Sequence, residues 1–394
     1  MGDALVASLE ASGVDASGVR RLSAEKEKDE ESGGTGRRKR RDGGAEEAET
    51  TASSSSTSTP VVVAVHDPAT GDVACSVADV AAVEESFTPE IVRREMERIG
   101  SGGAAEEKVF VIVDGNLSAA AVAAAACSSS SHSRSSSNPG IALFEPVSVA
   151  KGVRAVRGGQ LKCKVMTPNA AELLAMARAV EEEGSNFSTS TSTSSSNSGF
   201  SDAGEKSRNL DHFLRSTLAP AARALISRGV CEFVLVTLGE RGAALIGREE
   251  EMRGGSERDA AGLFKATTTT TTNRDNGSSS SSSSSSTSNL FKLAACVVPA
   301  APIPSGGVIV STGGAGDAFA AGFLAAVAAG SGENEKTRTM TEPKSSASIP
   351  FALAAGAAAA AQVVASPLSS PKLDAESVWR CARDLEARAR WVAL

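Results

Sequence analysis

The chain has 394 residues, of which 41% are hydrophobic, and its formal net charge is −7. This acidic balance argues against a broad nucleic-acid-binding surface, and the first ten residues carry Asp3 and Glu10 instead of the pattern of a secretory signal. The six cysteines show neither CxxC pairs nor metal-ligand spacing. We therefore expect an intracellular, cytoplasmic protein with reduced thiols and no membrane-spanning segment.

Five tracts rich in Ser, Thr, Gly or charged residues interrupt the chain. Such tracts cannot bury enough apolar surface to fold, and long insertions in surface loops cost little closure entropy. We therefore interpret them as loop expansions of one domain, for whose core about 265 residues remain. The tracts are residues 24–59, 128–138, 185–209, 250–289 and 331–347.

The first predicted elements are two β-type runs, residues 61–66 and 73–78, which read as a hairpin around a Pro-Ala-Thr-Gly turn. After them, continuous apolar strands alternate with helices, which is typical of a parallel sheet covered on both faces. We predict strands at residues 109–113, 141–144, 165–166, 233–236, 243–246 and 308–310, and helices at 90–99, 119–126, 168–182, 210–228 and 351–364 and from residues 318 and 375. The expected fold class is α/β, with three layers, a mostly parallel central sheet and a small β lid.

The stretch Ser311–Asp317 joins the predicted strand at 308–310 to an Ala-rich helix. Its glycines allow consecutive N–H groups to converge at the start of the helix, where the helix dipole favours an anion. Asp317 would oppose a phosphate there unless it takes a proton from an attacking hydroxyl. A plain turn between strand and helix is the alternative. We predict a phosphate site with Asp317 as base and an anion hole formed by Gly313, Gly314, Ala315 and Gly316.

Polar residues follow several predicted strands at the carboxyl edge of the sheet, where ligands bind in folds of this class. Asn169 and Glu172 lie three residues apart at the start of a helix, so they either form a capping box or order Mg²⁺ beside a phosphate. The turn with Thr237, Gly239 and Gly242 is either an ordinary Gly-rich hairpin or a holder of nucleotide phosphates. 

Three further polar side chains are candidates for contacts at the site. Glu145 and Lys151 come after the strand at 141–144, and Asn116 comes after the strand at 109–113. Lys151 is either an ordinary surface lysine or a cation that reaches the transferred phosphate. By position, Asn116 and Glu145 belong to the same edge as Asp317, and Lys151 comes six residues after Glu145.

Three motifs in the same order resemble the ribokinase-like (PfkB) carbohydrate kinases. The segment 311–323 resembles the C-terminal signature of that family, 166–172 its NxxE region and 236–242 its nucleotide turn. Within the family, 113–118 and 144–151 are most similar to pseudouridine kinases. The resemblance covers most of the chain outside the low-complexity tracts, up to about residue 365.

The resemblance implies a ribokinase-like fold and an ATP-dependent phosphorylation of the 5'-hydroxyl of a nucleoside or sugar, pseudouridine first. Another PfkB kinase of the ribokinase or adenosine kinase type, or a non-catalytic nucleotide-binding paralogue, are the alternatives. It also implies roles for the residues above. Asp317 is the base beside the anion hole, Asn169 and Glu172 order Mg²⁺, Thr237, Gly239 and Gly242 line the ATP site, and Asn116, Glu145 and Lys151 contact substrate or phosphate.

The chain also departs from that family. Residues 2–17 resemble a segment that the family reaches only after a first strand and a Gly-Gly/Asn substrate motif, so we expect a single kinase domain over 1–394 that is incomplete at its N-terminus. Ser311 and Gly313 replace an Asp and a Thr that are common in relatives that bind K⁺, so the sequence does not decide whether this chain binds a monovalent cation. ATP and a small nucleoside or sugar are the expected partners, with neither nucleic acid nor membrane, and the lid hairpin could pair with a second copy in a homodimer.

Overall fold

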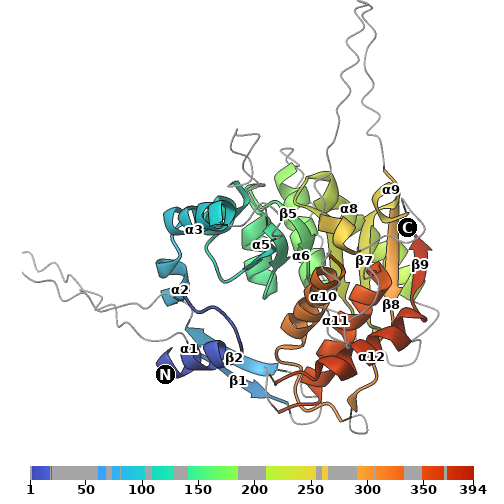
Figure 1. Ribbon diagram of the computed structural model, residues 1–394. Helices are drawn as coiled ribbons and strands as arrows, with labels where there is room; N and C mark the ends of the chain where they lie inside the picture. The colour runs from blue at the N-terminus through green and yellow to red at the C-terminus, as the bar shows by residue number, and fades with distance from the viewer. Residues whose placement is uncertain are drawn as a thin grey trace, which may run out of the picture. The chain divides into compact units, whose positions relative to one another are not determined.

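The computed structural model describes most of the predicted elements but only parts of the low-complexity tracts. Of the predicted loop expansions, 24–59, 128–138 and 185–209 lie outside the described residues, as do most of 250–289 and 331–347. The described residues are 2–17, 19, 61–67, 73–79, 81–102, 109–127, 141–184, 210–253, 260–264, 291–304, 308–331, 348–367 and 371–394 (Figure 1).

The chain divides into two compact units. The smaller comprises residues 1–63 and 77–86 and contains helices α1 (Gly2–Ala11) and α2 (Ala81–Ser86). The larger comprises residues 64–76 and 87–394. Strands β1 (Val61–His66) and β2 (Val73–Asp79) pair in a two-stranded sheet, which confirms the predicted hairpin.

A seven-stranded sheet forms the centre of the larger unit, with the strands in sequential order from β3 to β9. The first four strands are parallel, whereas β6 to β9 pair antiparallel. The mostly parallel prediction therefore holds for the first part of the sheet. A turn of five residues, 238–242, joins β6 to β7, and this is too short for the crossover that a parallel pair requires. The strands are β3 (Val111–Asp114), β4 (Ile141–Glu145), β5 (Cys163–Met166), β6 (Cys231–Thr237), β7 (Ala243–Arg248), β8 (Leu293–Val298) and β9 (Arg390–Ala393).

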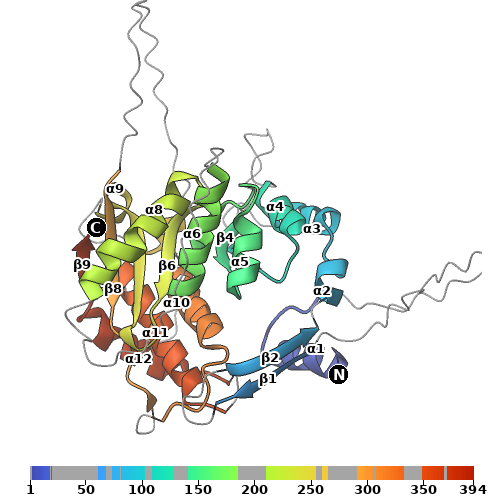
Figure 2. The same ribbon diagram turned by 180° about the vertical axis from the view of Figure 1, so that it is seen from behind.

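Helices cover both faces of this sheet, because alternate side chains of its buried strands point to opposite sides. In β7, Ala244 and Ile246 pack with the helices of one face, and Ala243 and Leu245 with those of the other. Figure 1 shows α10, α11 and α12 in front of the sheet, and Figure 2 shows α5, α6 and α8 in front of it from behind. The three-layer α/β prediction is therefore confirmed.

Most helices of the larger unit match the predicted ranges to within a few residues, but α5 and α9 were not predicted, and the single helix predicted at 210–228 is divided into α7, a π-helical turn and α8. The helices of this unit are α3 (Pro89–Gly102), α4 (Ala119–Cys127), α5 (Val149–Val156), α6 (Ala170–Gly184), α7 (Leu210–Phe213), α8 (Ala219–Ser227), α9 (Glu249–Arg253), α10 (Ala315–Ser331), α11 (Ile349–Val364) and α12 (Ala375–Glu386). A π-helical turn, Leu214–Leu218, links α7 to α8, and two 3₁₀ turns span Gly239–Arg241 and Ala260–Phe264. Within these described residues no helix is long and apolar enough to cross a membrane.

The main errors of the sequence prediction concern the last strands. Residues 308–310 form no strand, and Val308 is 66% exposed; the segment is attached instead through the Val310 N–H, which donates to the Val364 carbonyl (2.8 Å). The strand before the glycine turn is β8, whose six residues are all buried. Part of the expected 250–289 loop also belongs to the core, since Met252 is buried against this sheet.

Helix α10 is held in place by a close contact with α11. A Cβ atom added to Gly322 would lie 2.7 Å from the Ala355 carbonyl oxygen, and one added to Gly356 would lie 2.7 Å from that of Phe319. The two helix backbones therefore touch where the side chains are absent. This contact fixes the position of the helix that carries Asp317.

Candidate active site

The glycine turn before α10 leaves some backbone donors for a ligand and uses others internally. The Gly313 N–H donates to Ser311 Oγ (3.1 Å), and the Ala315 N–H donates to the Thr312 carbonyl (3.3 Å). Among the described residues, the N–H groups of Gly314 and Gly316 have no acceptor. A Cβ added to Gly316 would meet nothing within 4 Å. The turn thus offers two of the four predicted anion-hole donors beside an open space.

Asp317 lies in the first turn of α10, because this helix begins at Ala315 and not near residue 318 as predicted. An acidic residue is favourable there, since it interacts with the positive end of the helix dipole. Although the side chain remains accessible, the surrounding protein partly dehydrates it and raises its pKa, and the negative Asp114 raises this pKa further. Asp317 is therefore a stronger base than an ordinary surface aspartate.

Glu145, the last residue of β4, is the most perturbed carboxylate at this edge of the sheet. Burial raises its pKa to about 7, and the negative charges of Glu172 and Asp317 act in the same direction. The Thr167 hydroxyl and the Val147 N–H (3.3 Å) donate to this carboxylate and partly oppose the shift. Glu145 consequently changes its charge near neutral pH.

Asn169 and Glu172 form the capping box that their spacing allowed. The Asn169 N–H donates to Glu172 Oε2 and the Glu172 N–H donates to Asn169 Oδ1, both at 2.9 Å. Glu172 is only 6% exposed, and burial raises its pKa despite these hydrogen bonds. The cap accounts for the spacing of the two residues, and the remaining carboxylate oxygen of Glu172 is left for other partners.

Lys151 is half-buried and belongs to a polar network, not to the open surface. Its ammonium group donates to Asn116 Oδ1 (2.5 Å), and the Asn116 side-chain amide donates to Asp114 Oδ2 (2.9 Å). From the same helix, Arg154 donates to the carbonyls of Gly115 (2.9 Å) and Leu117 (3.0 Å). The network attaches the loop after β3 to α5 and places Asn116 and Lys151 together.

The turn from Thr237 to Gly242 connects two neighbouring strands of the sheet. Both of its glycines have positive φ, 59° at Gly239 and 91° at Gly242. A Cβ added to Gly242 would lie 2.1 Å from the Val298 carbonyl oxygen, so the close packing of this turn requires glycine. Thr237 pairs with Asn169 through an isolated parallel bridge. The turn therefore adjoins the start of α6 at the same edge.

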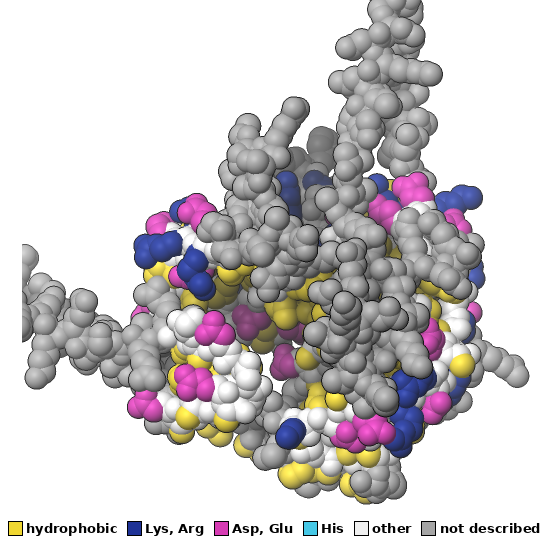
Figure 3. All heavy atoms as spheres, in the orientation of Figure 1, with side chains coloured by type: hydrophobic (Ala, Val, Ile, Leu, Met, Phe, Trp, Pro, Cys, Tyr) yellow, Lys and Arg dark blue, Asp and Glu magenta, His cyan; other side chains and the backbone are white. Residues whose placement is uncertain are grey.

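The structure brings together the carboxylates that the strand order placed at one edge. Asp114, Glu145, Glu172 and Asp317 come from four different elements, yet the charges of Glu172 and Asp317 help to raise the pKa of Glu145, and the charge of Asp114 helps to raise that of Asp317. Figure 3 shows acidic side chains near the centre of this face, beside hydrophobic ones. Thr167 as a partner of Glu145 and Arg154 as a partner of the loop after β3 were not predicted from the sequence. The only signal in the sequence is their position, since Thr167 lies within the segment 166–172 and Arg154 follows the segment 144–151.

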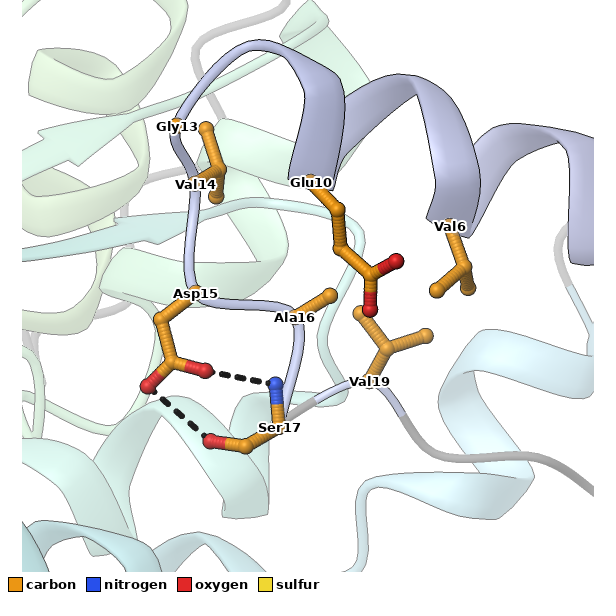
Figure 4. A pocket seen from close by; sticks show the side chains of 8 residues that line it. All are labelled: Val6, Glu10, Gly13, Val14, Asp15, Ala16, Ser17 and Val19. Atoms are coloured by element: carbon orange, nitrogen blue, oxygen red, sulfur yellow. Dashed lines mark hydrogen bonds between the residues drawn. The ribbon is translucent and has the colours of Figure 1, made fainter.

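The smaller unit contains a hollow of about 580 Å³, which is a second candidate for a ligand-binding site. It is lined by residues of α1 and of the turn that follows, and Asp15 accepts hydrogen bonds there from the N–H (2.9 Å) and hydroxyl (3.0 Å) of Ser17 (Figure 4). Its remaining lining residues include valines and Glu10. Apart from Glu10 and Asp15, this lining holds no charged side chain, so the carboxyl edge of the large sheet is the stronger candidate.

The acidic groups of the larger unit fit a magnesium ion bound mainly through water. Among the described residues, no three His, Cys, Asp or Glu side chains form a ready-made metal cage. Mg²⁺ commonly keeps several waters and takes only one or two carboxylates from the protein. Glu145 and Glu172 both have raised pKa values, with Glu172 contributing to the shift at Glu145, and a nearby cation would relieve that repulsion.

Comparison with known proteins gives one curated relative and several solved structures. The chain is 33% identical over 186 residues to the pseudouridine kinase of Arabidopsis thaliana; the match covers 47% of this chain and 42% of that protein. The chain thus spans less than half the length of the curated relative it matches. No family model matches the sequence. 

The match confirms the resemblance that the motifs indicated. This chain resembles the ribokinase-like kinases. Among solved structures, similarity is found to ribokinases of Giardia lamblia (16% identity, 80% of this chain and 68% of that one, TM-score 0.39) and of Arabidopsis thaliana in complex with ribose and ATP (15%, 78% and 65%, 0.37). These identities are low, and the ribokinase-like resemblance itself rests on the motifs and the curated relative.

Proposed function

We propose that this protein is an ATP-dependent kinase of the ribokinase-like type that phosphorylates the 5'-hydroxyl of pseudouridine. The observation that carries the proposal is the pairing of an anion-binding turn with a base. The N–H groups of Gly314 and Gly316 have no acceptor among the described residues, and Asp317 follows them directly with a raised pKa. The partial match to a pseudouridine kinase supports the choice of acceptor.

In this proposal Asp317 takes the proton of the acceptor hydroxyl as that oxygen attacks the γ-phosphoryl group. Its raised pKa brings its basicity nearer to what a proton acceptor at neutral pH needs. The N–H groups of Gly314 and Gly316, at the start of α10, stabilise negative charge on the transferred group.

The other residues of this edge would hold the nucleotide and its metal. In this proposal Thr237, Gly239 and Gly242 would line the nucleotide phosphates, and Glu172 with Asn169 would hold Mg²⁺ through water. When bound, Mg²⁺ neutralises phosphate charge. Asn116 and Lys151, which are joined by a hydrogen bond, would contact the acceptor or the phosphate, together with Glu145.

The test is turnover of ATP with pseudouridine by the purified protein. We expect ADP and a phosphomonoester in equal amounts, and Asp317→Asn should lower kcat by about 10²–10⁴-fold while leaving the fold intact. Glu376→Gln, on the exposed surface of α12, is the matched acidic control and should retain kcat. Unaltered turnover in Asp317→Asn would reject Asp317 as the base.

Assays with a panel of acceptors test the identity of the acceptor separately from the presence of kinase activity. Preference for ribose or adenosine over pseudouridine would keep the kinase but change its acceptor. ATP binding by calorimetry, with no ADP formed for any acceptor at high protein concentration, would instead indicate a nucleotide-binding protein without kinase activity. 

The exposed face of the hairpin supports a further proposal, a homodimer through the lid. Val63, Val65 and Val77 of β1 and β2 are 55–77% exposed. A two-stranded sheet is marginal alone, and pairing with a second copy would cover these side chains. Sedimentation of the wild type against Val63→Lys should show loss of the dimer in the variant; two identical monomeric profiles would reject it.

A further inference from the structure

The loop between β4 and α5 contains the one residue other than glycine that has a positive φ within the described part of the chain. This residue is Val147, with φ 66°. A β-branched side chain disfavours this left-handed region strongly. The Ser148 N–H donates to the Pro146 carbonyl (2.7 Å) across it, so residues 146–148 form a γ-turn with a positive central φ, which is a rare and strained conformation.

Burial of the valine side chain does not compensate this strain, because Val147 is 40% exposed. The turn is held by its surroundings instead. Pro146 is buried, and Ser148 caps α5 by accepting from the Lys151 N–H (3.4 Å). On the other side, the Gly115 N–H donates to the Glu145 carbonyl (2.8 Å).

Gly115 packs so tightly against the turn that no side chain fits there. A Cβ at this position would lie 2.4 Å from the Pro146 carbonyl oxygen and 3.1 Å from Lys151 Cβ. The loop after β3, which carries Asp114 and Asn116, therefore presses directly on the strained turn. The network of Lys151 and Arg154 described above holds that loop in place.

This backbone conformation determines one of the two hydrogen bonds that hold the Glu145 carboxylate. The strained turn directs the Val147 N–H back to Glu145 Oε1 (3.3 Å), while the Thr167 hydroxyl holds Oε2. Both carboxylate oxygens are thus fixed, at a point where Glu172 and Asp317 are the neighbouring charges. Strained backbone that surrounding contacts hold in place is found most often at functional sites.

We propose that Val147 is a positioning residue, whose strained turn fixes the Glu145 carboxylate beside Glu172 and Asp317 for phosphoryl transfer. This inference rests on the proposed kinase function and adds to it a device that controls one of its side chains. The turn geometry matters here and the valine side chain does not, which gives the proposal its test.

Two substitutions of Val147 separate the turn from the side chain. Glycine adopts positive φ without cost, so Val147→Gly should keep kcat within about twofold and raise the unfolding temperature. Proline cannot adopt positive φ and has no N–H, so Val147→Pro should lower kcat about 10–100-fold with little change in KM for ATP. Val149→Pro is the matched control, because proline is tolerated at the first position of α5.

A double-mutant cycle shows whether Val147 acts through Glu145. In the Glu145→Gln background, Val147→Pro should cause no further loss of kcat, since the carboxylate that the turn positions is already absent. An equal loss in both backgrounds would overturn the proposal. So would full activity of Val147→Pro, or a loss in Val147→Gly or Val149→Pro as large as that in Val147→Pro.

A crystal structure of Val147→Pro without substrate distinguishes failure of this proposal from failure of the kinase function. Proline has no N–H to donate to Glu145 Oε1, so the Glu145 carboxylate should leave the position in which the Thr167 hydroxyl holds it in the wild type. In Val147→Gly, which keeps this N–H, the carboxylate should stay in that position. A Glu145 carboxylate that keeps its wild-type position in Val147→Pro overturns the positioning role even if no acceptor is ever phosphorylated.

Discussion

The parallel and the antiparallel part of the large sheet differ in what their strands carry. The parallel strands β3 and β4 end in Asp114 and Glu145, and polar residues follow β5 and β6 at the same edge. In β7 and β8, by contrast, every residue is buried except Arg248. The strand carboxylates Asp114 and Glu145 therefore belong to the parallel part, whereas β7 and β8 contribute a continuous apolar core.

The largest expected effect on the free energy of unfolding is in the apolar strands of the antiparallel part. Leu245 of β7 is fully buried between the sheet and the helices α10 and α11, so Leu245→Ala should lower the free energy of unfolding by about 3–5 kcal/mol. Ile112 of β3 is 56% exposed, and Ile112→Ala should cost less than about 0.5 kcal/mol. Urea unfolding of both variants checks the contrast, which equal losses would contradict.

A smaller effect of opposite sign is expected at the polar edge. Burial raises the pKa of Glu145 from 4.5 to about 7. Between these two pH values the folded chain holds the proton while the unfolded chain loses it, so the free energy of unfolding falls as pH rises from 4.5 to about 7. Glu145→Gln removes this cost, so it should stabilise the protein by about 1–2 kcal/mol at pH 8 and hardly at all at pH 4.

Glu376→Gln serves as the control for this change, because its exposed ion pair with Arg380 contributes little at any pH. Unfolding curves at pH 4, 6 and 8 decide the matter. A stability gain for Glu145→Gln that does not depend on pH would show that packing, and not the carboxylate charge, is the cause.

The smallest effect is expected at the N-terminal cap of α6, the helix that follows the parallel strand β5. Asn169→Ala removes the acceptor of the Glu172 N–H and should lower the free energy of unfolding by about 1 kcal/mol. Asn169→Ser keeps a capping oxygen and should restore most of this loss. If both variants unfold like the wild type, the cap contributes nothing to stability.

The sequence predicted those features that depend on local patterns. The apolar runs of β4 and β6, the hairpin of β1 and β2 and the position of Asp114 and Glu145 at one edge all follow from periodicity and strand order, whereas Asp317 was assigned to this edge from a strand at 308–310 that does not form. The strand at 308–310 was wrong because a short apolar run has no preference between pairing with a strand and lying against a helix end. Strand β8 was overlooked because it follows a long Ser-rich tract without a turn signal.

The chemistry of the site depends on contacts between distant residues, which the sequence does not show. Glu145 looks like any glutamate after a strand, and its raised pKa arises only from burial together with Glu172 and Asp317. Nothing in the local sequence predicts the positive φ of Val147, since valine is disfavoured there. Such conflicts between local preference and the fold occur where function constrains the backbone.

The contact of Gly322 with Ala355 and of Gly356 with Phe319 limits how this protein can diversify. At these two glycines backbone lies against backbone, so a larger residue at either position would force the two helices apart. The position of Asp317 is consequently inherited as a fixed reference, and variants with new acceptors must arise from residues around it. The loops after β3 and β4 are then the segments in which a change of substrate preference would first be selected.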